Sequence, residues 1–197
     1  MALGNLATRV LSAVVLLPPL LYAIYQNHSP HIVWGIVLVA SVLCMAEALA
    51  FKLDDATDRR ASLIIGAAAC SLLYWLPPYT NPVLVALFVA VVPTALYYLF
   101  RFGDIPSVFD RLNASMMAII YGGFLITTLA IIKRDFDFVG GGDFIVLILC
   151  TAWLSDTGGY FAGKYLGKKK LYPAVSPKKT WAGSIGGVIS VLIGAAV

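Results

Sequence analysis

The sequence predicts an all-α polytopic membrane protein. Of its 197 residues, 60% are hydrophobic and only 12% are charged, and the mean hydropathy is +0.89. Soluble domains average about 45–50% apolar and about 25% charged residues, so this chain has too little charge to cover a soluble surface. Its apolar residues also fall into runs close to the roughly 20 residues that a helix needs to cross a bilayer. These observations exclude both a disordered chain and a soluble globular domain.

Seven apolar runs predict about seven transmembrane helices in a single transmembrane domain covering residues 1–197. The third run is short, and the seventh reaches the end of the sequence. The first and fourth runs contain prolines, which membrane helices tolerate. In chain order, the predicted helices are Ala7–Tyr25, His31–Phe51, Ala61–Leu76, Pro82–Phe100, Asn113–Ile132, Phe144–Gly163 and Trp181–Val197.

The positions of lysine and arginine predict the orientation of these helices. When successive loops are assigned to alternate sides, twelve of the 14 basic residues fall on one side, and only Lys133 and Arg134 fall on the other. Cytoplasmic loops carry an excess of such residues, so the N-terminus and the Lys164–Lys179 loop are predicted to be cytoplasmic. Residues 151–197 hold six lysines and one acidic residue. This imbalance predicts an anionic partner near the C-terminal part, either lipid headgroups or a nucleotide.

Two carboxylates, Glu47 and Asp156, fall inside predicted helices. Such a residue costs about 2.5–3.5 kcal/mol on insertion scales, so its presence calls for a reason. Glu47 lies near the cytoplasmic end of its helix, where snorkelling, pairing with Lys52 and a functional role all stay open. Asp156 shares one helix face with Tyr160 and Lys164, at a spacing of four. It either pairs with Lys164 or forms a cytoplasm-facing site for Mg²⁺, which prefers oxygen ligands.

Small residues at a spacing of four predict a close contact between the sixth and seventh helices. Glycine, alanine and serine allow two membrane helices to approach closely. The sixth helix carries Ser155, Gly159 and Gly163, and also Gly167 if it continues that far. The seventh carries Gly183 with Gly187, and Gly186 with Ser190 and Gly194.

The segment before the seventh helix predicts a phosphate-binding helix start. Serine is a preferred N-cap and proline a preferred first helical residue, so Ser176 is predicted to cap the helix, with Pro177 in its first turn. The free amides and the dipole of such a turn attract anions, and Lys178 and Lys179 add positive charge. The Lys168–Lys170 run is instead typical of contact with the inner leaflet. Together with Asp156, the helix start predicts a pocket for phosphate or pyrophosphate.

The motif region 155–187 reads SDTGGYFAGKYLGKKKLYPAVSPKKTWAGSIGG and resembles the bacterial phosphatidate cytidylyltransferase (CDP-diacylglycerol synthase) family. That family carries D-[ST]-[GA]-[GA]-Y-x-x-G-[KR]-x-x-G-[KR], followed by S-P-x-K-[ST]. Ala182 departs from it, because the family usually has Glu or Gln there. The family's later signature, with a D-R-x-D carboxylate pair, does not occur up to Val197. We therefore expect this chain to be the N-terminal part of such a protein, truncated within an apolar helix.

The resemblance implies a reaction and roles for individual residues. Phosphatidate attacks the α-phosphorus of CTP, giving CDP-diacylglycerol and pyrophosphate in phospholipid biosynthesis, with Mg²⁺ required. Asp156 is expected to be the metal-linked carboxylate and, with Lys179, catalytic. Since both substrates are anionic, lysines are needed to bring them together. The expected substrate-binding residues are Tyr160, Lys164, Ser176, Lys178, Lys179 and Thr180.

The resemblance also implies partners and a location. The expected partners are CTP, phosphatidate and the lipid bilayer, with no nucleic acid, and a homodimer stays open. The expected location is the bacterial inner membrane, with the active site facing the cytoplasm. Two alternatives from other classes remain: a small transporter with Asp156 on an ion pathway, and a non-catalytic membrane protein of the same fold. A related enzyme acting on another lipid phosphate is a variant of the leading hypothesis.

Overall fold

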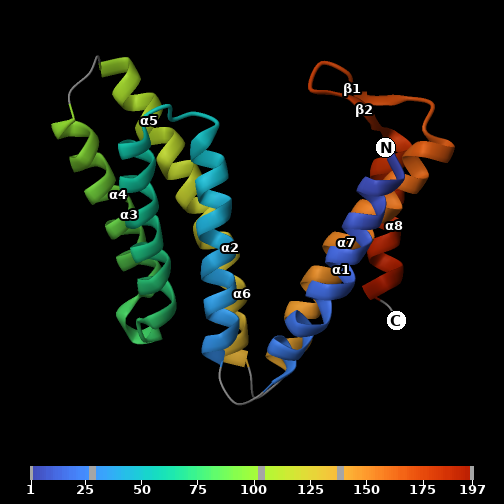
Figure 1. The fold of residues 1–197 in the computed structure, drawn as a ribbon, viewed down its shortest axis with the longest axis horizontal. Coiled ribbons are helices and arrows are strands. Elements are labelled where there is room, and N and C mark those ends of the chain that lie inside the picture. Colours follow the sequence, from blue (N-terminus) through green and yellow to red (C-terminus); the bar gives the residue numbers. More distant parts are fainter. Residues whose placement is uncertain (1, 27–29, 102–104, 137–139, 196–197) are drawn as a thin grey trace. The chain divides into compact units, whose positions relative to one another are not determined.

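The computed structural model describes residues 2–26, 30–101, 105–136 and 140–195, and these form helices joined by short connections and one small hairpin (Figure 1). The chain divides into two compact units, Met1–Val139 and Gly140–Val197, and each is described by itself. Unit 1 contains α1 (Ala2–Tyr25), α2 (Pro30–Ala50), α3 (Ala56–Trp75), the 3₁₀ helix η1 (Pro78–Thr80), α4 (Pro82–Phe100), α5 (Ile105–Met117), the π-helix η2 (Ala118–Phe124) and α6 (Leu125–Phe136). Unit 2 contains α7 (Gly141–Leu166), β1 (Lys170–Tyr172), β2 (Ser176–Thr180) and α8 (Trp181–Ala195).

The described part of the chain confirms a helical protein of the membrane type. Four of its helical segments are long and apolar enough to cross a bilayer: Pro30–Ala50, Pro82–Phe100, Pro106–Phe136 and Gly141–Leu166. Val14–Tyr25 and Trp181–Ala195 are shorter apolar helices. Every predicted span overlaps one of the observed helical segments, but the count of seven membrane crossings and the cytoplasmic N-terminus stay predictions.

Several helices extend further than their apolar runs predicted. α3 begins at Ala56 rather than Ala61, because Asp55 caps it by accepting a hydrogen bond of 2.7 Å from the backbone N–H of Thr57. The polar turn after this cap continues the helix beyond the apolar segment. The predicted Asn113–Ile132 helix is part of a longer helical run, α5–η2–α6, whose central π-helix was not predicted.

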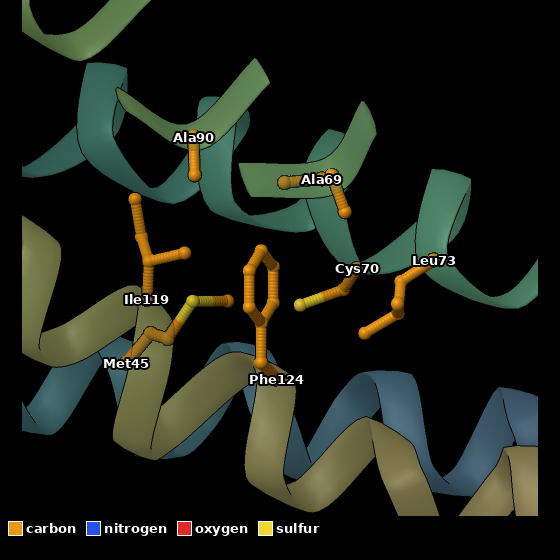
Figure 2. Packing of buried hydrophobic residues seen from close by; sticks show 8 residues of the cluster. Met45, Ala69, Cys70, Leu73, Ala90, Ile119 and Phe124 are labelled. Atoms are coloured by element: carbon orange, nitrogen blue, oxygen red, sulfur yellow. The ribbon is translucent and has the colours of Figure 1, made fainter. Parts of the chain in front are cut away.

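The core of unit 1 lies where α2, α3, α4 and η2 meet. Phe124 points from η2 toward Ala69 and Cys70 of α3, beside Met45 of α2 (Figure 2). The π-helix brings Gly123 against this cluster, since a Cβ there would lie 2.9 Å from the sulfur of Cys70. Close contact through a glycine is typical of helix packing in membranes. The buried cluster comprises Met45, Ala69, Cys70, Leu73, Ala86, Ala90, Ile119 and Phe124.

A buried ionic network ties α3, α4 and α5 together at one end of unit 1. Asp58 is 1% exposed; it forms ion pairs with Arg101 and Arg111 and accepts a 2.8 Å hydrogen bond from the hydroxyl of Tyr97. Arg101 also pairs with Asp55. This network satisfies a carboxylate that would otherwise be costly to bury.

The end of unit 1 remote from this network holds aromatic and polar side chains. There the hydroxyl of Tyr74 lies 3.0 Å from a ring nitrogen of His31, and Arg134 donates a hydrogen bond to the Tyr74 carbonyl. Arg101 and Arg111 therefore lie at the end of unit 1 opposite to Arg134, as alternating loops require.

Unit 2 adds one small hairpin to a described chain that is otherwise helical, as predicted. β1 and β2 pair antiparallel, with Lys170 opposite Thr180 and Tyr172 opposite Ser176. α7 and α8 lie side by side along their length, and the hairpin connects the C-terminus of α7 to the N-terminus of α8 (Figure 1).

Candidate functional site: a polar pocket between α7 and α8

α7 and α8 contact each other through glycines, as their spacing predicted. A Cβ on Gly183 would lie 2.9 Å from the carbonyl oxygen of Gly159, and one on Gly187 would lie 3.0 Å from that of Ser155. A Cβ on Gly186 would overlap the Cβ of Ala162. Any larger side chain at these positions would push the helices apart, so the small residues determine how closely the two helices approach.

A pocket of about 630 Å³ opens beside this glycine contact. Its floor is made of small residues from both helices, and its polar side chains come from α7, β2 and the start of α8. It brings together six of the seven residues that the sequence proposed for the site. The lining residues are Ser155, Asp156, Gly159, Tyr160, Gly163, Lys164, Lys178, Lys179, Thr180, Gly183, Ser184 and Gly187.

The α7 side of the pocket carries Asp156, Tyr160 and Lys164 on one helix face. The ammonium of Lys164 lies over two aromatic rings, 5.7 Å from the centre of Tyr160 and 5.6 Å from that of Tyr165. Such cation–π contacts hold a lysine without neutralising it. In the described part of the chain no ion pair joins Lys164 to Asp156. The structure therefore does not support the alternative in which Asp156 only pairs with Lys164.

The N-terminus of α8 corrects the predicted cap. Ser176 lies in β2 and is not an N-cap; instead Thr180 caps α8, because its Oγ1 accepts a 3.2 Å hydrogen bond from the backbone N–H of Gly183. The predicted sequence signal, serine followed by proline, is overridden by strand pairing with β1. Proline fits at the edge of a sheet because it does not need to donate a ladder hydrogen bond. Ser176 also lies outside the pocket lining.

This correction changes how the pocket attracts anions. Lys178 and Lys179 lie on the strand that leads into α8, not in its first turn. The N–H of Trp181 donates to the carbonyl of Lys169 at 3.1 Å, and that of Gly183 is held by Thr180, so two amides of the helix start already have partners. The lysine side chains therefore supply most of the attraction, with the helix dipole adding to it.

The charge of the pocket is suited to an anionic ligand that carries a cation. Three lysines and one carboxylate line it, and Asp156 is exposed to its interior. No group of three or more His, Cys, Asp or Glu residues is gathered anywhere in the described residues. Mg²⁺ is commonly bound by one or two carboxylates together with substrate phosphates, so Asp156 fits a metal that arrives with a nucleotide rather than one held in a protein cage.

Ser184 was missed by the sequence reasoning, and Glu47 lies outside this unit. The hydroxyl of Ser184 lines the pocket and lies 3.4 Å from the carbonyl oxygen of Thr180, a contact that its spacing of four from Thr180 would have suggested. Glu47 is exposed on α2 in unit 1, and no ion pair joins it to Lys52 within the ranges that the structure describes. Its role stays open.

Two apolar helices packed through glycines, with a pocket lined by three lysines and one carboxylate, define a helical protein of the membrane type with a basic polar site. The chain matches the cytidylyltransferase family over residues 7–197 and belongs to that family.

Several curated relatives carry the name phosphatidate cytidylyltransferase. The one from Thermotoga maritima is 28% identical over 193 residues, which is 97% of this chain and 67% of that protein. The one from Brucella suis is 38% identical over 76 residues, 39% of this chain and 27% of its own length. The one from Haemophilus influenzae is 47% identical over 53 residues, 26% of this chain and 18% of its own length. The matched regions thus span at most about two thirds of these relatives.

Proposed function

We propose that the protein transfers a cytidylyl group from CTP to phosphatidate, giving CDP-diacylglycerol and pyrophosphate. Membership of the cytidylyltransferase family and the names of the relatives support this reaction. The observation that carries it here is the pocket that places Asp156 among three lysines between two apolar helices. In the reaction, a phosphate oxygen of phosphatidate forms a bond to the α-phosphorus of CTP, and the bond from that phosphorus to pyrophosphate breaks.

The lysines have the task of holding two anionic substrates together. Lys164, Lys178 and Lys179 line the pocket from two sides, so a polyphosphate between them contacts positive charge on both. Fixing the reactants in line and neutralising the phosphoryl oxygens are the main sources of rate in such transfers. Tyr160 keeps Lys164 in position through its ring, and Thr180 holds the start of α8. We assign Ser176 to the hairpin rather than to phosphate binding.

Asp156 is proposed to hold Mg²⁺ together with the phosphates of CTP. The metal ion would neutralise charge on the phosphoryl oxygens and polarise the reacting phosphorus. Asp156 would hold that ion from the α7 side of the pocket, while Lys178 and Lys179 line it from β2. A single carboxylate leaves most of the coordination shell to the nucleotide and to water.

The inner membrane, with the pocket facing the cytoplasm, is the proposed location. CTP is cytoplasmic and the phosphate of the lipid lies at headgroup level, so the reaction belongs at the inner interface. Two features support this: the apolar helices, and the six lysines in unit 2 that follow the positive-inside rule. A homodimer stays a prediction that cross-linking in membranes tests.

The test replaces single carboxylates on the same helix. In the protein expressed from its complete reading frame, Asp156→Asn is expected to lower CTP- and Mg²⁺-dependent formation of CDP-diacylglycerol at least about 100-fold, the scale on which removal of one electrostatic group acts. Asp143→Asn is the matched control, since Asp143 lies roughly 20 Å away in the first turn of α7 and outside the pocket.

The readouts separate this proposal from its alternatives. Expression and elution in detergent should be unchanged in both variants, and Asp143→Asn should retain its activity. Near-normal activity of Asp156→Asn would overturn the metal-binding role. Ion flux through proteoliposomes without any dependence on CTP would favour a transporter instead.

A further inference from the structure

The hairpin of unit 2 is a small, well-defined projection with an apolar tip. Its tip is the turn Tyr172–Val175, which is closed by a 3.2 Å hydrogen bond from the N–H of Val175 to the carbonyl of Tyr172. Pro173 occupies the second position of this turn, where its fixed φ is favourable. The side chains of Tyr172 and Val175 are 60% and 76% exposed. Apolar side chains exposed in this way are suited to contact with a membrane interface.

Three consecutive lysines at the base of the hairpin add charge that the pocket does not use. Lys168, Lys169 and Lys170 are all exposed, and none of them lines the pocket. From residue 157 to residue 197 the sequence holds six lysines and no acidic residue, so unit 2 provides little to neutralise them. In the described part of unit 2, no ion pair involves these three side chains. Their counter-charge therefore has to come from outside this unit.

The hairpin is held against the helix ends. The N–H of Trp181 donates to the carbonyl of Lys169, which fastens the base of the hairpin to the start of α8. In Figure 1 the hairpin runs across the ends of α7 and α8 instead of continuing along their axes. A segment that crosses the ends of two apolar helices has the orientation needed to lie along a membrane surface. At the end of α7, Tyr165 and Leu166 are also apolar and are each 71% exposed.

We infer that residues 168–180, the basic hairpin, bind the anionic lipid surface, with the Tyr172–Val175 tip among the headgroups and Lys168–Lys170 on lipid phosphates. Tyrosine favours the membrane interface. Each lysine of a basic segment beside a membrane raises the affinity for anionic lipid by up to about tenfold. The positive charge of the hairpin, together with its place at the ends of two apolar helices, favours anionic lipid over a protein as its partner. This inference goes beyond the proposed function, because it requires neither CTP nor phosphatidate.

The test measures the depth of the hairpin tip in vesicles without substrates. Val175→Cys is labelled with bimane in a background that carries Cys44→Ser and Cys150→Ser. The remaining cysteine, Cys70, is 0% exposed. The background protein without Val175→Cys, treated with bimane in the same way, checks that Cys70 does not react. Quenching by headgroup-level nitroxide lipids is compared in phosphatidylcholine vesicles with and without phosphatidylglycerol. The triple variant K168Q/K169Q/K170Q removes the charge from the hairpin.

The expected result is strong quenching only with phosphatidylglycerol and only with the three lysines present. The three lysines together should raise the partition of the hairpin tip into the anionic headgroup region about 100-fold. Added salt should reduce this partition. The matched control, Lys52→Gln with Arg60→Gln on unit 1, should quench like the parent. Equal quenching in neutral vesicles, equal quenching in the triple variant, or no quenching in any vesicle would each overturn the inference. None of these readouts depends on catalysis, so failure of the proposed function would leave them unchanged.

Discussion

Replacing Gly186 by alanine is expected to destabilise unit 2 by forcing α7 and α8 apart. A Cβ at this position would overlap the Cβ of Ala162 and lie 3.1 Å from the carbonyl oxygen of Gly158. Non-bonded carbon atoms normally stay about 3.5–4.0 Å apart, and an alanine methyl has no rotamer that could move it aside. The two backbones therefore have to separate. Overpacking of this kind typically costs about 1–3 kcal/mol.

Two further variants isolate this steric cause. Gly35→Ala on α2 is the matched control, because a Cβ there would meet no heavy atom within 4 Å. Within a helix it should gain up to about 1 kcal/mol from reduced backbone entropy. The double variant Ala162→Gly with Gly186→Ala removes the overlapping methyl and leaves the 3.1 Å contact with Gly158, which a shift of a few tenths of an ångström relieves. It should recover most of the lost stability.

Thermal unfolding of the purified protein in detergent measures these differences. A change of 1 kcal/mol shifts the melting temperature by about 2–4 °C in a chain of this size, so Gly186→Ala should melt roughly 2–12 °C below the parent and further still below Gly35→Ala. If Gly186→Ala and Gly35→Ala melt together, or if the double variant is no more stable than Gly186→Ala, the helices do not meet through these residues and the reasoning fails.

Three further substitutions test other contacts. Asp58→Asn removes the carboxylate shared by Arg101 and Arg111. Since both arginines are about one third exposed, we expect the free energy of unfolding to fall by roughly 2–3 kcal/mol, less than for a fully buried pair. The denaturation midpoint should fall accordingly, and an unchanged midpoint would contradict the network. The hydrogen bond from the Thr57 N–H lowers the pKa of Asp55 below 3.8. The ionised Asp55 therefore contributes its full stabilisation of the fold above pH 3.8 and loses it as the pH falls through the lowered pKa. Asp55→Ala should melt at a lower temperature than the parent at pH 7, and this difference in melting temperature should narrow in acid. Thr180→Ala should cost about 1 kcal/mol by removing the cap of α8, whereas Thr180→Ser, which keeps the hydroxyl, should melt close to the parent.

The parts of the fold that were predictable depend on short-range periodicity. Apolar runs located the helices because a bilayer-length helix needs little beyond its own composition. The spacing of four between Gly183 and Gly187 predicted the α7–α8 contact because it places both residues on one face of the helix. The same periodicity placed Asp156, Tyr160 and Lys164 together, and the pocket contains all three.

The unpredicted parts depend on contacts between distant residues. Asp58 meets Arg111 across 53 positions in the sequence, and neither the run around Asp58 nor that around Arg111 indicates the other. The π-helix Ala118–Phe124 has a similar cause, since its glycines fit against α2 and α3 and not against residues nearby in sequence.

The wrong cap shows how strand pairing competes with a local signal and what this means for the pocket. Ser176 and Thr180 both have the side chain of a helix cap, and proline after Ser176 favours the earlier start. Pairing of Tyr172 with Ser176 instead continues the chain as a strand, and Thr180, 6% exposed, fits against Gly163 of α7 and Gly167 just after it. The backbone positions of Lys178 and Lys179 are consequently set by the hairpin and by the Thr180 cap together. A change in the hairpin is therefore expected to shift the lysines that we propose bind phosphate, even where it touches no residue of the pocket.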